Sequence, residues 1–245
     1  MVTASVVLFN ENLQTLKKTV DSFLETPLEK KLFLIDNSPT NRLEKYFKHP
    51  AIEYIFVGKN IGFGVAHNII LDKINSEFHL ILNPDVVFSS DVILALITEL
   101  SKSTDVSFIT PKVLFPNKEN QYVCRKHPTF FNLINRKSKI SKNQTLKNEY
   151  RNQDLERSFC PEFIHGCFML FKTADFKYLG GFDERYFLYM EDADICRKID
   201  LTGRKKLYYP GVQITHQYRR GSSKSVKLFF YHLSSALKYF LKWGF

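Results

Sequence analysis

Apolar runs and helix-type patterns alternate along the first half of the chain. Short apolar runs predict strands at residues 6–9, 31–35, 52–57, 78–82 and 106–110. Between them, apolar residues recur every three or four positions, which is the period of a helix with one buried face. This period predicts helices at 13–24, in a short segment ending near Lys48, at 62–74 and at 91–102. The alternation predicts an α/β fold, with a mostly parallel sheet and helices on both faces.

Residues 117–158 interrupt this alternation, because they are rich in Lys, Asn, Gln and Ser. We expect a mobile insertion or lid there, not a separate domain. Order resumes with an apolar strand at 163–171, which is interrupted by His165 and Gly166. A helix at 192–201 and short strands at 207–209 and 212–215 follow, and Gly203 suits the end of that helix. We therefore expect one domain over 1–220, followed by a helix in 221–245.

Charge is distributed unevenly along the chain. The net charge is −2 over residues 1–116, +6 over 117–158, −3 over 159–200 and +9 over 201–245, giving +10 in total. An acidic body thus carries a basic insertion and a basic tail. Such segments suggest a polyanionic partner, either nucleic acid or an anionic membrane surface, although they can also serve solubility.

Composition excludes several classes of protein. With 245 residues, 44% hydrophobic and 24% charged, the chain has the profile of a globular domain and not of a disordered, collagen-like or disulfide-stapled protein. The four cysteines show no C-x-x-C spacing, so zinc-binding and thioredoxin-like chemistry are not supported. We recognise neither a secretory leader nor an apolar stretch of membrane-spanning length, and expect a cytoplasmic protein.

Polar residues follow three of the predicted strands. Asn10 follows the first, Asp36 and Asn37 the second, and Asn83 and Asp85 the fourth. Asn and Asp are common turn residues, so each could serve its turn alone. Ligands of parallel α/β sheets, however, bind outside the carboxyl ends of the strands. Together these residues favour a nucleotide-type site.

Glycines and acids mark two further segments. Gly62 and Gly64 open a predicted helix, where backbone N–H groups could approach a phosphate or simply allow tight packing. Five carboxylates lie within twelve residues: Asp183, Glu184, Glu191, Asp192 and Asp194. The dipole of the following helix accounts for one or two acids at its start, but clustered carboxylates also suit a general base or a divalent cation. His216 ends a late strand and is either structural or a ligand.

Six of these motifs occur in an order that resembles the family 2 glycosyltransferases. They are Asp36-Asn37 after a strand, Asn60-x-Gly62-Phe63-Gly64, Leu82-Asn83-Pro84-Asp85-Val86, Gly180-Gly181-Phe182-Asp183-Glu184, Glu191-Asp192-Ala193-Asp194, and His216. The Asn-Pro-Asp and Asn-x-Gly-Phe-Gly versions look most like the bacterial rhamnosyltransferase branch, which builds O-antigen and related cell-surface polysaccharides. The resemblance covers roughly residues 2 to 240.

The resemblance implies a GT-A fold with a Rossmann-like nucleotide-sugar half at 1–116 and a smaller acceptor and catalytic half at 159–220. It implies an inverting hexosyltransferase that takes its sugar from a nucleoside diphosphate. The rhamnosyltransferase branch suggests dTDP-L-rhamnose as donor and a lipid-diphosphate-linked saccharide as acceptor. Another donor, such as UDP-galactofuranose or a UDP-hexose, stays open.

The resemblance also implies roles for individual residues. Asp36 would contact the nucleotide base, Asp192 would be the general base, and Glu191 and Asp194 would lie on the acceptor side. Asp85 would take the place of the family's D-x-D motif and hold Mg²⁺ or Mn²⁺, with His216 as a further ligand. The expected donor-binding residues are Asn10, Asp36, Asn37, Asn60, Gly62, Asn68, Asn83 and Asp85. Asn83-Pro84-Asp85 offers one carboxylate where the fuller motif offers two or more, which puts metal dependence in doubt.

Residues 224–243 predict a basic amphipathic helix. At 100° per residue, Lys224, Lys227, Lys238 and Lys242 lie on one side. The opposite side carries Val226, Phe229, Phe230, Leu233, Ala236, Leu237, Phe240 and Leu241. Its apolar face could lie in an anionic membrane interface, at the inner face of the cell membrane, or dock on the domain. We expect membrane contact, and a body that folds without this helix.

Two other functions compete with glycosyl transfer. A nucleic-acid-binding module would explain the basic segments, but no recognition-helix or RNP-type motif is present. A nucleotidyltransferase would have a similar fold, but its Gly-rich, basic signature near the N-terminus is absent.

Overall fold

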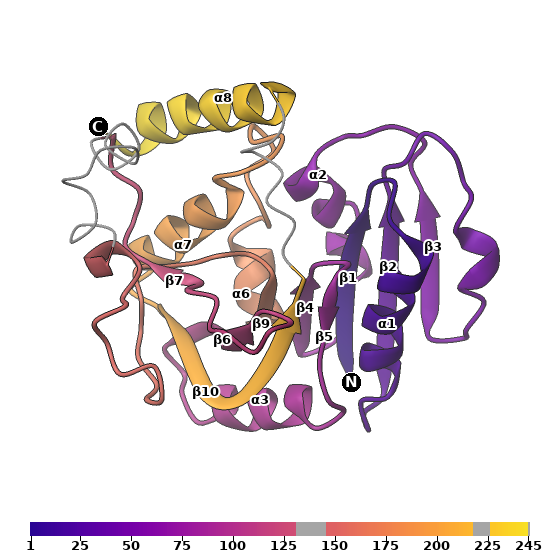
Figure 1. Ribbon diagram of the computed structural model, residues 1–245, viewed down its shortest axis with the longest axis horizontal. Coiled ribbons are helices and arrows are strands. Elements are labelled where there is room, and N and C mark those ends of the chain that lie inside the picture. The colour runs from indigo at the N-terminus through magenta and orange to yellow at the C-terminus, as the bar shows by residue number, and fades with distance from the viewer. Residues whose placement is uncertain (131–145, 218–225, 245) are drawn as a thin grey trace.

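The computed structural model describes residues 1–130, 146–217 and 226–244 (Figure 1). Within these residues, eight strands form one large sheet in the order β3-β2-β1-β4-β9-β6-β10-β5. β1 (Val2–Leu8), β2 (Lys30–Asp36), β3 (Ile52–Phe56) and β4 (Phe78–Leu82) are parallel neighbours. Their carboxyl ends therefore open on one edge of the sheet, where Asp36 and Asn83 lie.

The second half of the sheet mixes directions. β9 (Phe168–Lys172) runs antiparallel between β4 and β6 (Val106–Leu114), and β10 (Lys205–His216) runs parallel to β6. The end of β10 pairs antiparallel with the two-residue strand β5 (Val86–Val87). A separate ribbon joins β7 (Cys124–Arg125) to β8 (Phe163–Ile164). The mostly parallel α/β sheet predicted from the sequence is confirmed.

Helices cover the sheet where their apolar faces predict. α1 (Leu13–Leu24) buries Leu16, Val20 and Phe23, and α3 (Val92–Ser101) packs against β6 and β10. α6 (Thr173–Tyr178) follows β9 directly, and α7 (Glu191–Leu201) packs against β8 and β10. Short 3₁₀ turns lie at Glu44–Tyr46 and Leu71–Lys73.

Several predicted boundaries were wrong. The helix predicted at 62–74 is the shorter α2 (Phe63–Asn68), followed by the 3₁₀ turn at Leu71–Lys73, and the side chain of its last residue bonds to the backbone of Phe182. The two strands predicted at 207–209 and 212–215 are one strand, β10, with an irregularity between Tyr209 and Gln213. α6 and β5 were not predicted. Part of the expected lid, residues 131–145, lies outside the described residues.

A chain of buried polar side chains crosses the core between β1, β4 and α2. The Thr3 hydroxyl contacts both the Ser76 hydroxyl (2.6 Å) and His79 Nδ1 (2.8 Å). His79 Nε2 contacts the Ser5 hydroxyl (3.0 Å), which in turn contacts His67 Nδ1 (2.7 Å). Both imidazoles are fully buried, and burial lowers the pKa of His79 to about 3 and that of His67 well below its usual value. Both histidines are therefore neutral in the folded protein at neutral pH.

The C-terminal helix α8 (Val226–Trp243) lies along α7 at the edge of the molecule (Figure 1). Asp194 of α7 is fully buried, and its Oδ1 accepts hydrogen bonds from Lys242 Nζ and Trp243 Nε1, each at 2.7 Å. Ser235 and Lys238 donate to the carbonyl oxygens of Leu188 and Arg185. The expectation that the body folds without this helix does not agree with these contacts, because a buried carboxylate has its cationic partner on α8.

Candidate functional site

Asp85 and His216 meet at the carboxyl edge of the sheet. β5 begins one residue after Asp85, and its antiparallel pairing sets Val86 opposite His216. As a result, His216 Nε2 lies 3.2 Å from Asp85 Oδ1 and 3.4 Å from Asn83 Nδ2. Asp85 is 9% exposed and His216 2% exposed, so the pair is largely buried at this edge of the sheet.

Gln121 fixes the orientation of His216. His216 Nδ1 lies 3.0 Å from Gln121 Oε1, and Gln121 Nε2 donates to the backbone oxygen of His216 at 2.6 Å. The amide oxygen can only accept, so His216 Nδ1 carries a hydrogen and Nε2 faces Asp85. Burial would lower the pKa of His216, but the neighbouring Cys167 and Asp85 raise it to about 10. A positive charge, a proton or a cation, is therefore favoured between Nε2 and the carboxylate.

Asp192 is held at the start of α7 by two backbone amides. Gly166 N–H donates to its Oδ2 at 3.1 Å, and Ala193 N–H donates to its Oδ1 at 2.9 Å. Asp192 is 9% exposed, so these bonds hold its carboxyl group in place without burying the residue completely. These two bonds fix the direction of both carboxylate oxygens.

One short segment connects Asp192 to the Asp85–His216 pair. Gly166 bonds to Asp192, and the next residue, Cys167, accepts a hydrogen bond from the backbone N–H of Asn83 at 3.0 Å. The antiparallel pairing of β4 with β9 sets this contact. The segment Gly166–Cys167 thus links the residue that bonds to Asp192 with the strand end that precedes Asp85.

Glu191 and the loop before it are unusual. Glu191 is 6% exposed, and among the described residues its Oε2 has no hydrogen-bond partner. Burial, with the nearby Asp192, raises the pKa of Glu191 well above its usual value, which favours its protonated form. Tyr189 and Met190 both have φ of 70°, a left-handed backbone that costs free energy for residues other than glycine. Backbone strain of this kind is concentrated at functional sites.

The predicted donor-binding residues gather at the ends of β1 and β2. Asp36 is fully buried and accepts from Ser38 N–H and the Tyr54 hydroxyl. The Asn37 amide donates to the carbonyl oxygen of Gly62 (3.0 Å), while its buried Oδ1 has no partner among the described residues. These bonds join the end of β2 to the start of α2.

Gly62 is required for close approach. Its φ is 96°, and an added Cβ would lie 2.5 Å from the carbonyl oxygen of Phe187. Asn60 Oδ1 accepts from Gly62 N–H, and Asn10, which is exposed with φ of 55°, donates its backbone N–H to the Ser38 hydroxyl. Asn37 and Asn60 therefore both bond to Gly62, and Asn10 bonds to the residue after Asn37, so the ends of β1 and β2 lie beside the start of α2.

Two predicted site residues are engaged elsewhere. Asn68 uses both amide atoms on the backbone of Phe182, at 2.8 and 2.9 Å, and so fastens α2 to the segment before α7. Asp194 is fully buried beneath α8, where it also accepts from the Tyr186 hydroxyl. In this structure Asp194 joins two helices and is not open to an acceptor.

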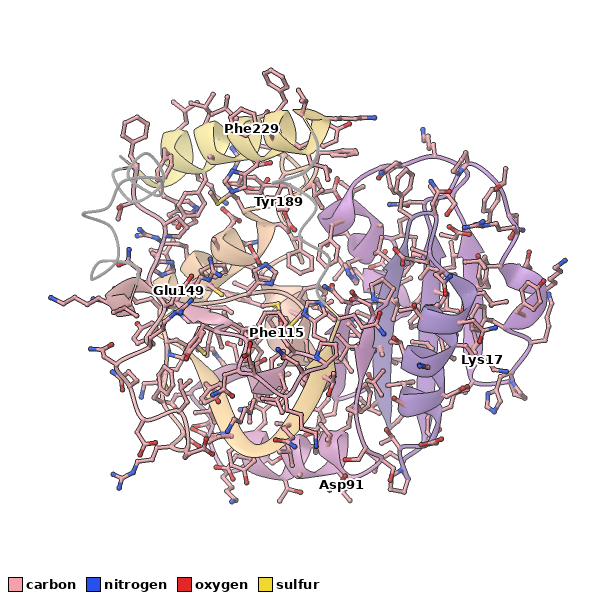
Figure 2. All side chains as sticks on the ribbon, in the orientation of Figure 1. Lys17, Asp91, Phe115, Glu149, Tyr189 and Phe229 are labelled. Carbon is pink, nitrogen blue, oxygen red and sulfur yellow. The ribbon has the colours of Figure 1, made fainter. Side chains whose placement is uncertain are left out.

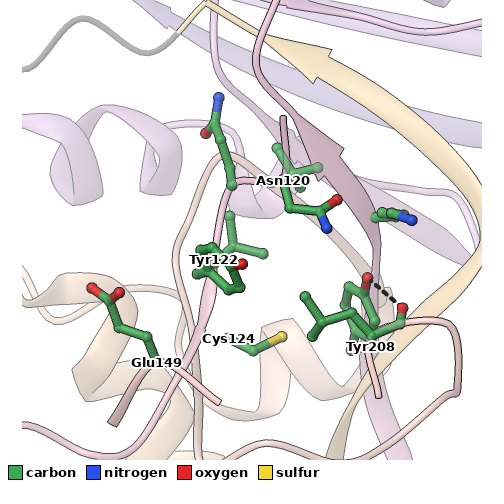
Figure 3. Close-up of a pocket in the computed structure, with 10 residues that line it drawn as sticks. Asn120, Tyr122, Cys124, Glu149 and Tyr208 are labelled. Carbon is green, nitrogen blue, oxygen red and sulfur yellow. Dashed lines mark hydrogen bonds between the residues drawn. The ribbon is translucent and has the colours of Figure 1, made fainter. Parts of the chain in front are cut away.

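Gly166, Cys167 and Gln121 were not predicted as site residues. The interruption of an apolar strand at His165 and Gly166 was the available signal for the first two; Gln121 had none. Gln121 also lines a small pocket beside β7, together with residues that include Asn120, Tyr122, Cys124, Glu149 and Tyr208 (Figure 3). No predicted site residue lines this pocket.

No three His, Cys, Asp or Glu side chains converge on one point as metal ligands in the described part of the chain. Asp85 and His216 provide one oxygen and one nitrogen, with the Asn83 amide beside them. That set fits a divalent cation that keeps waters and takes further oxygens from a diphosphate. Over the same residues, no helix is long and apolar enough to cross a membrane.

Comparison with known proteins decides the family. The model of glycosyl transferase family 2 matches residues 3–179, well over half of the chain. The chain belongs to this family. It is thus a glycosyltransferase, which excludes the nucleic-acid-binding and nucleotidyltransferase alternatives as its main function.

Relatives of this glycosyltransferase include proteins named as rhamnosyltransferases. It is 28% identical to the rhamnosyltransferase WbbL of Escherichia coli K12 over 243 residues, covering 91% of this chain and 87% of that protein. It is 25% identical over 195 residues to the N-acetylglucosaminyl-diphospho-decaprenol L-rhamnosyltransferase of Mycobacterium tuberculosis H37Rv, covering 74% of this chain. It spans only 62% of the mycobacterial protein.

Solved structures confirm the GT-A fold. GalNAc-T7, crystallised with UDP, GalNAc and Mn²⁺, superposes with a TM-score of 0.67 at 18% identity, over 89% of this glycosyltransferase and 43% of that chain. The mannosyltransferase PcManGT of Pyrobaculum calidifontis, in complex with GDP-Man and Mn²⁺, gives 0.62 at 18% identity, over 90% and 58%. At this identity the likeness establishes the fold alone.

Proposed function

We propose that this glycosyltransferase moves L-rhamnose from dTDP-L-rhamnose, with inversion, onto a lipid-diphosphate-linked saccharide in the synthesis of an O-antigen-like polysaccharide. The observation that carries the reaction is the Asp192 carboxylate, held by two backbone amides and joined through Gly166 and Cys167 to the rim that bears Asp85. The names of the relatives support the sugar and the acceptor class. A UDP-hexose or UDP-galactofuranose is the alternative donor.

Asp192 would act as the general base. An inverting transfer needs one base that takes the proton from the acceptor hydroxyl as that oxygen attacks the anomeric carbon and the nucleoside diphosphate leaves. A carboxylate with both oxygens anchored meets this need, because its position is fixed before the acceptor arrives. In its protonated form, which burial favours, the neighbouring Glu191 would donate a hydrogen bond to an acceptor oxygen without competing for the proton.

Asp85 and His216 would hold a Mg²⁺ or Mn²⁺ ion, with Asn83 beside them. When bound, such an ion offsets negative charge on the departing diphosphate. Asn10, Asp36, Asn37, Asn60 and Gly62 would surround the nucleotide. Asp36 is fully buried and both its carboxylate oxygens accept hydrogen bonds from Ser38 and Tyr54, so it would support the nucleotide site by fixing these two residues.

A lipid-linked acceptor would bring the enzyme to a membrane surface. We propose peripheral association with the anionic inner face of the cell membrane through residues in 224–245. The tail supports this, since residues 201–245 carry nine basic residues and no acid.

A panel of nucleotide sugars, each with a lipid-diphosphate-linked saccharide, tests the reaction. The wild-type enzyme is expected to transfer from dTDP-L-rhamnose, and Asp192→Asn to lose about 10²–10⁴-fold in kcat while still binding donor by calorimetry. Asp72→Asn, which changes an exposed aspartate in the turn after α2, is the matched control and should keep its activity. Near wild-type turnover by Asp192→Asn would remove Asp192 as the base, and transfer from a different donor would replace the sugar.

A further inference from the structure

The exposed side of α8 is a continuous apolar stripe. Val226, Phe230, Leu233, Leu237 and Leu241 are 75%, 60%, 45%, 48% and 76% exposed. At 100° per residue these five fall within one narrow arc, which we call the outer face of α8. Phe229 (55% exposed) borders it and is labelled on the outermost helix in Figure 2.

The apolar arc predicted for this helix is divided between two surroundings. Ala236 and Phe240 turn toward the body and are buried, and Phe240 packs edge-on against Phe130. The outer face turns away from the body. α8 forms one edge of the molecule in Figure 1, with no other labelled element beyond it in that view. Docking on the domain therefore accounts for only part of the apolar surface.

The lysines of α8 indicate what the outer face contacts. Lys242, which was predicted on the basic side of the helix, turns inward to Asp183 and Asp194. Lys227 and Lys238 are exposed and fall along one border of the outer face, and Lys238 Nζ also donates to the carbonyl oxygen of Arg185. An apolar stripe bordered by lysines is the pattern of a helix that lies in a bilayer interface, with ammonium groups at the level of the lipid phosphates.

We propose that the outer face of α8 is a membrane-docking surface, and that α8 enters the bilayer interface while it remains fixed to α7. This deepens the proposed function, because it names the surface that would bring the enzyme to a lipid-linked acceptor. The charge of α8 favours a bilayer over a second copy of the chain. Lys227 and Lys238 lie beside the outer face and α8 carries no acid, so this side of the helix attracts anionic lipid, whereas a second copy would bring like charges together.

Contacts between α8 and α7 fix the direction in which the outer face points. Lys242 and Trp243 bond to Asp194, two residues after Asp192 on α7. A bilayer contacting the outer face therefore has a set orientation toward the helix that bears the proposed base. A flexible tether would give no such orientation.

A matched pair of leucines tests the surface. Leu241 on α8 and Leu201 at the end of α7 are both helical and both 76% exposed. Binding of the full-length protein is measured by sedimentation with vesicles of phosphatidylglycerol and phosphatidylcholine, without donor or acceptor. Leu241→Glu is expected to weaken binding about tenfold or more, because it puts a charge where a leucine would be buried in the bilayer. Leu201→Glu is expected to bind as the wild type does.

A matched set of lysines tests the headgroup contact. Lys227→Gln with Lys238→Gln should lower binding about fivefold per lysine at low salt and much less at high salt. Lys17→Gln with Lys18→Gln on α1, which Figure 2 shows on the opposite side of the molecule through the labelled Lys17, should change little. Melting temperatures within a few degrees of wild type would show that all variants are folded.

Three results would overturn the proposal: no binding to anionic vesicles by the wild type, equal effects of Leu241→Glu and Leu201→Glu, or a dimer in solution that Leu241→Glu disperses. Because the vesicles carry neither donor nor acceptor, their binding is independent of transfer. Transfer without vesicle binding would sink only this proposal, and vesicle binding without transfer would sink only the proposed reaction.

Discussion

Replacing Lys242 by methionine should destabilise the whole enzyme, although the residue lies three positions from the C-terminus. Lys242 Nζ contacts Asp194 Oδ1 at 2.7 Å, and Asp194 is fully buried. Removing the cationic partner of a buried carboxylate costs about 3–5 kcal/mol when nothing replaces it. Here the Trp243 indole and the Tyr186 hydroxyl still donate to the same oxygen, and the Lys242 side chain is 21% exposed. We therefore expect a loss of about 2–3 kcal/mol.

This loss is measurable in a thermal melt and in urea. For a protein of this size, about 2–4 °C is lost per kcal/mol, so Lys242→Met should lower Tm by about 4–12 °C. Asp194→Asn in the Lys242→Met background should restore much of the stability, because it removes the unpaired charge. The double-mutant cycle should therefore show a coupling free energy of about 1.5 kcal/mol or more.

Lys238→Met provides the matched control. Lys238 lies one turn earlier on α8 and donates to a backbone oxygen, that of Arg185, so its loss strands no buried charge. We expect less than about 1 kcal/mol for this variant. Equal losses for the two lysine variants, or strictly additive effects in the cycle, would refute the argument that Asp194 depends on α8.

Three further predictions concern the site and the core. Gly166→Ala should lower kcat about 10²-fold with little change in donor binding, because the added Cβ would lie 3.3 Å from the Asp192 Cβ and shift the carboxylate; steady-state kinetics and calorimetry check this. Gln121→Met should weaken binding of Mn²⁺ with a nucleoside diphosphate about 10- to 100-fold, whereas Gln121→Glu keeps an acceptor for His216 Nδ1 and should weaken this binding less. Titration followed by electron paramagnetic resonance measures both affinities. Equal affinities of the two variants would refute the orienting role of Gln121. The free energy of unfolding should fall as the pH drops below about 6.5, because His79 binds a proton there in the unfolded chain but only near its pKa of about 3 in the folded protein. In urea melts across pH 7 to 5, His79→Gln should flatten this dependence by up to about 1.4 kcal/mol per pH unit. An unchanged slope would contradict the assignment.

The sequence was informative where function depends on short motifs at strand ends. Asn83-Pro84-Asp85 after a buried strand predicted a polar group at the carboxyl edge, and Asp85 does lie there. The mostly parallel direction of the strands also followed from the alternation of apolar runs and helical periods. These features are local or repeat with a fixed period, so they can be read without knowing the partner segments.

Features that depend on distant pairing could not be predicted. β5 has only two residues, and its pairing with the end of β10 is what brings His216 to Asp85. Gln121 contacts His216 across 95 positions, and no spacing rule links them. For α8 the helical period gave the correct apolar arc, but not which part of it packs, because that depends on Asp194 and the shape of α7.

The buried polar chain through Thr3, Ser5 and His79 has a consequence for misfolding. A purely apolar interface would tolerate β4 sliding by one residue against β1, but such a slip would turn His79 to the opposite face of the sheet. The Thr3 and Ser5 hydroxyls would then be buried without partners, at a cost of about 1–3 kcal/mol each. His67 on α2 contacts the Ser5 hydroxyl, so α2 also packs correctly only on the correctly aligned pair. Apolar residues at these positions could match the stability of the native core, but would no longer discriminate against the slipped sheet.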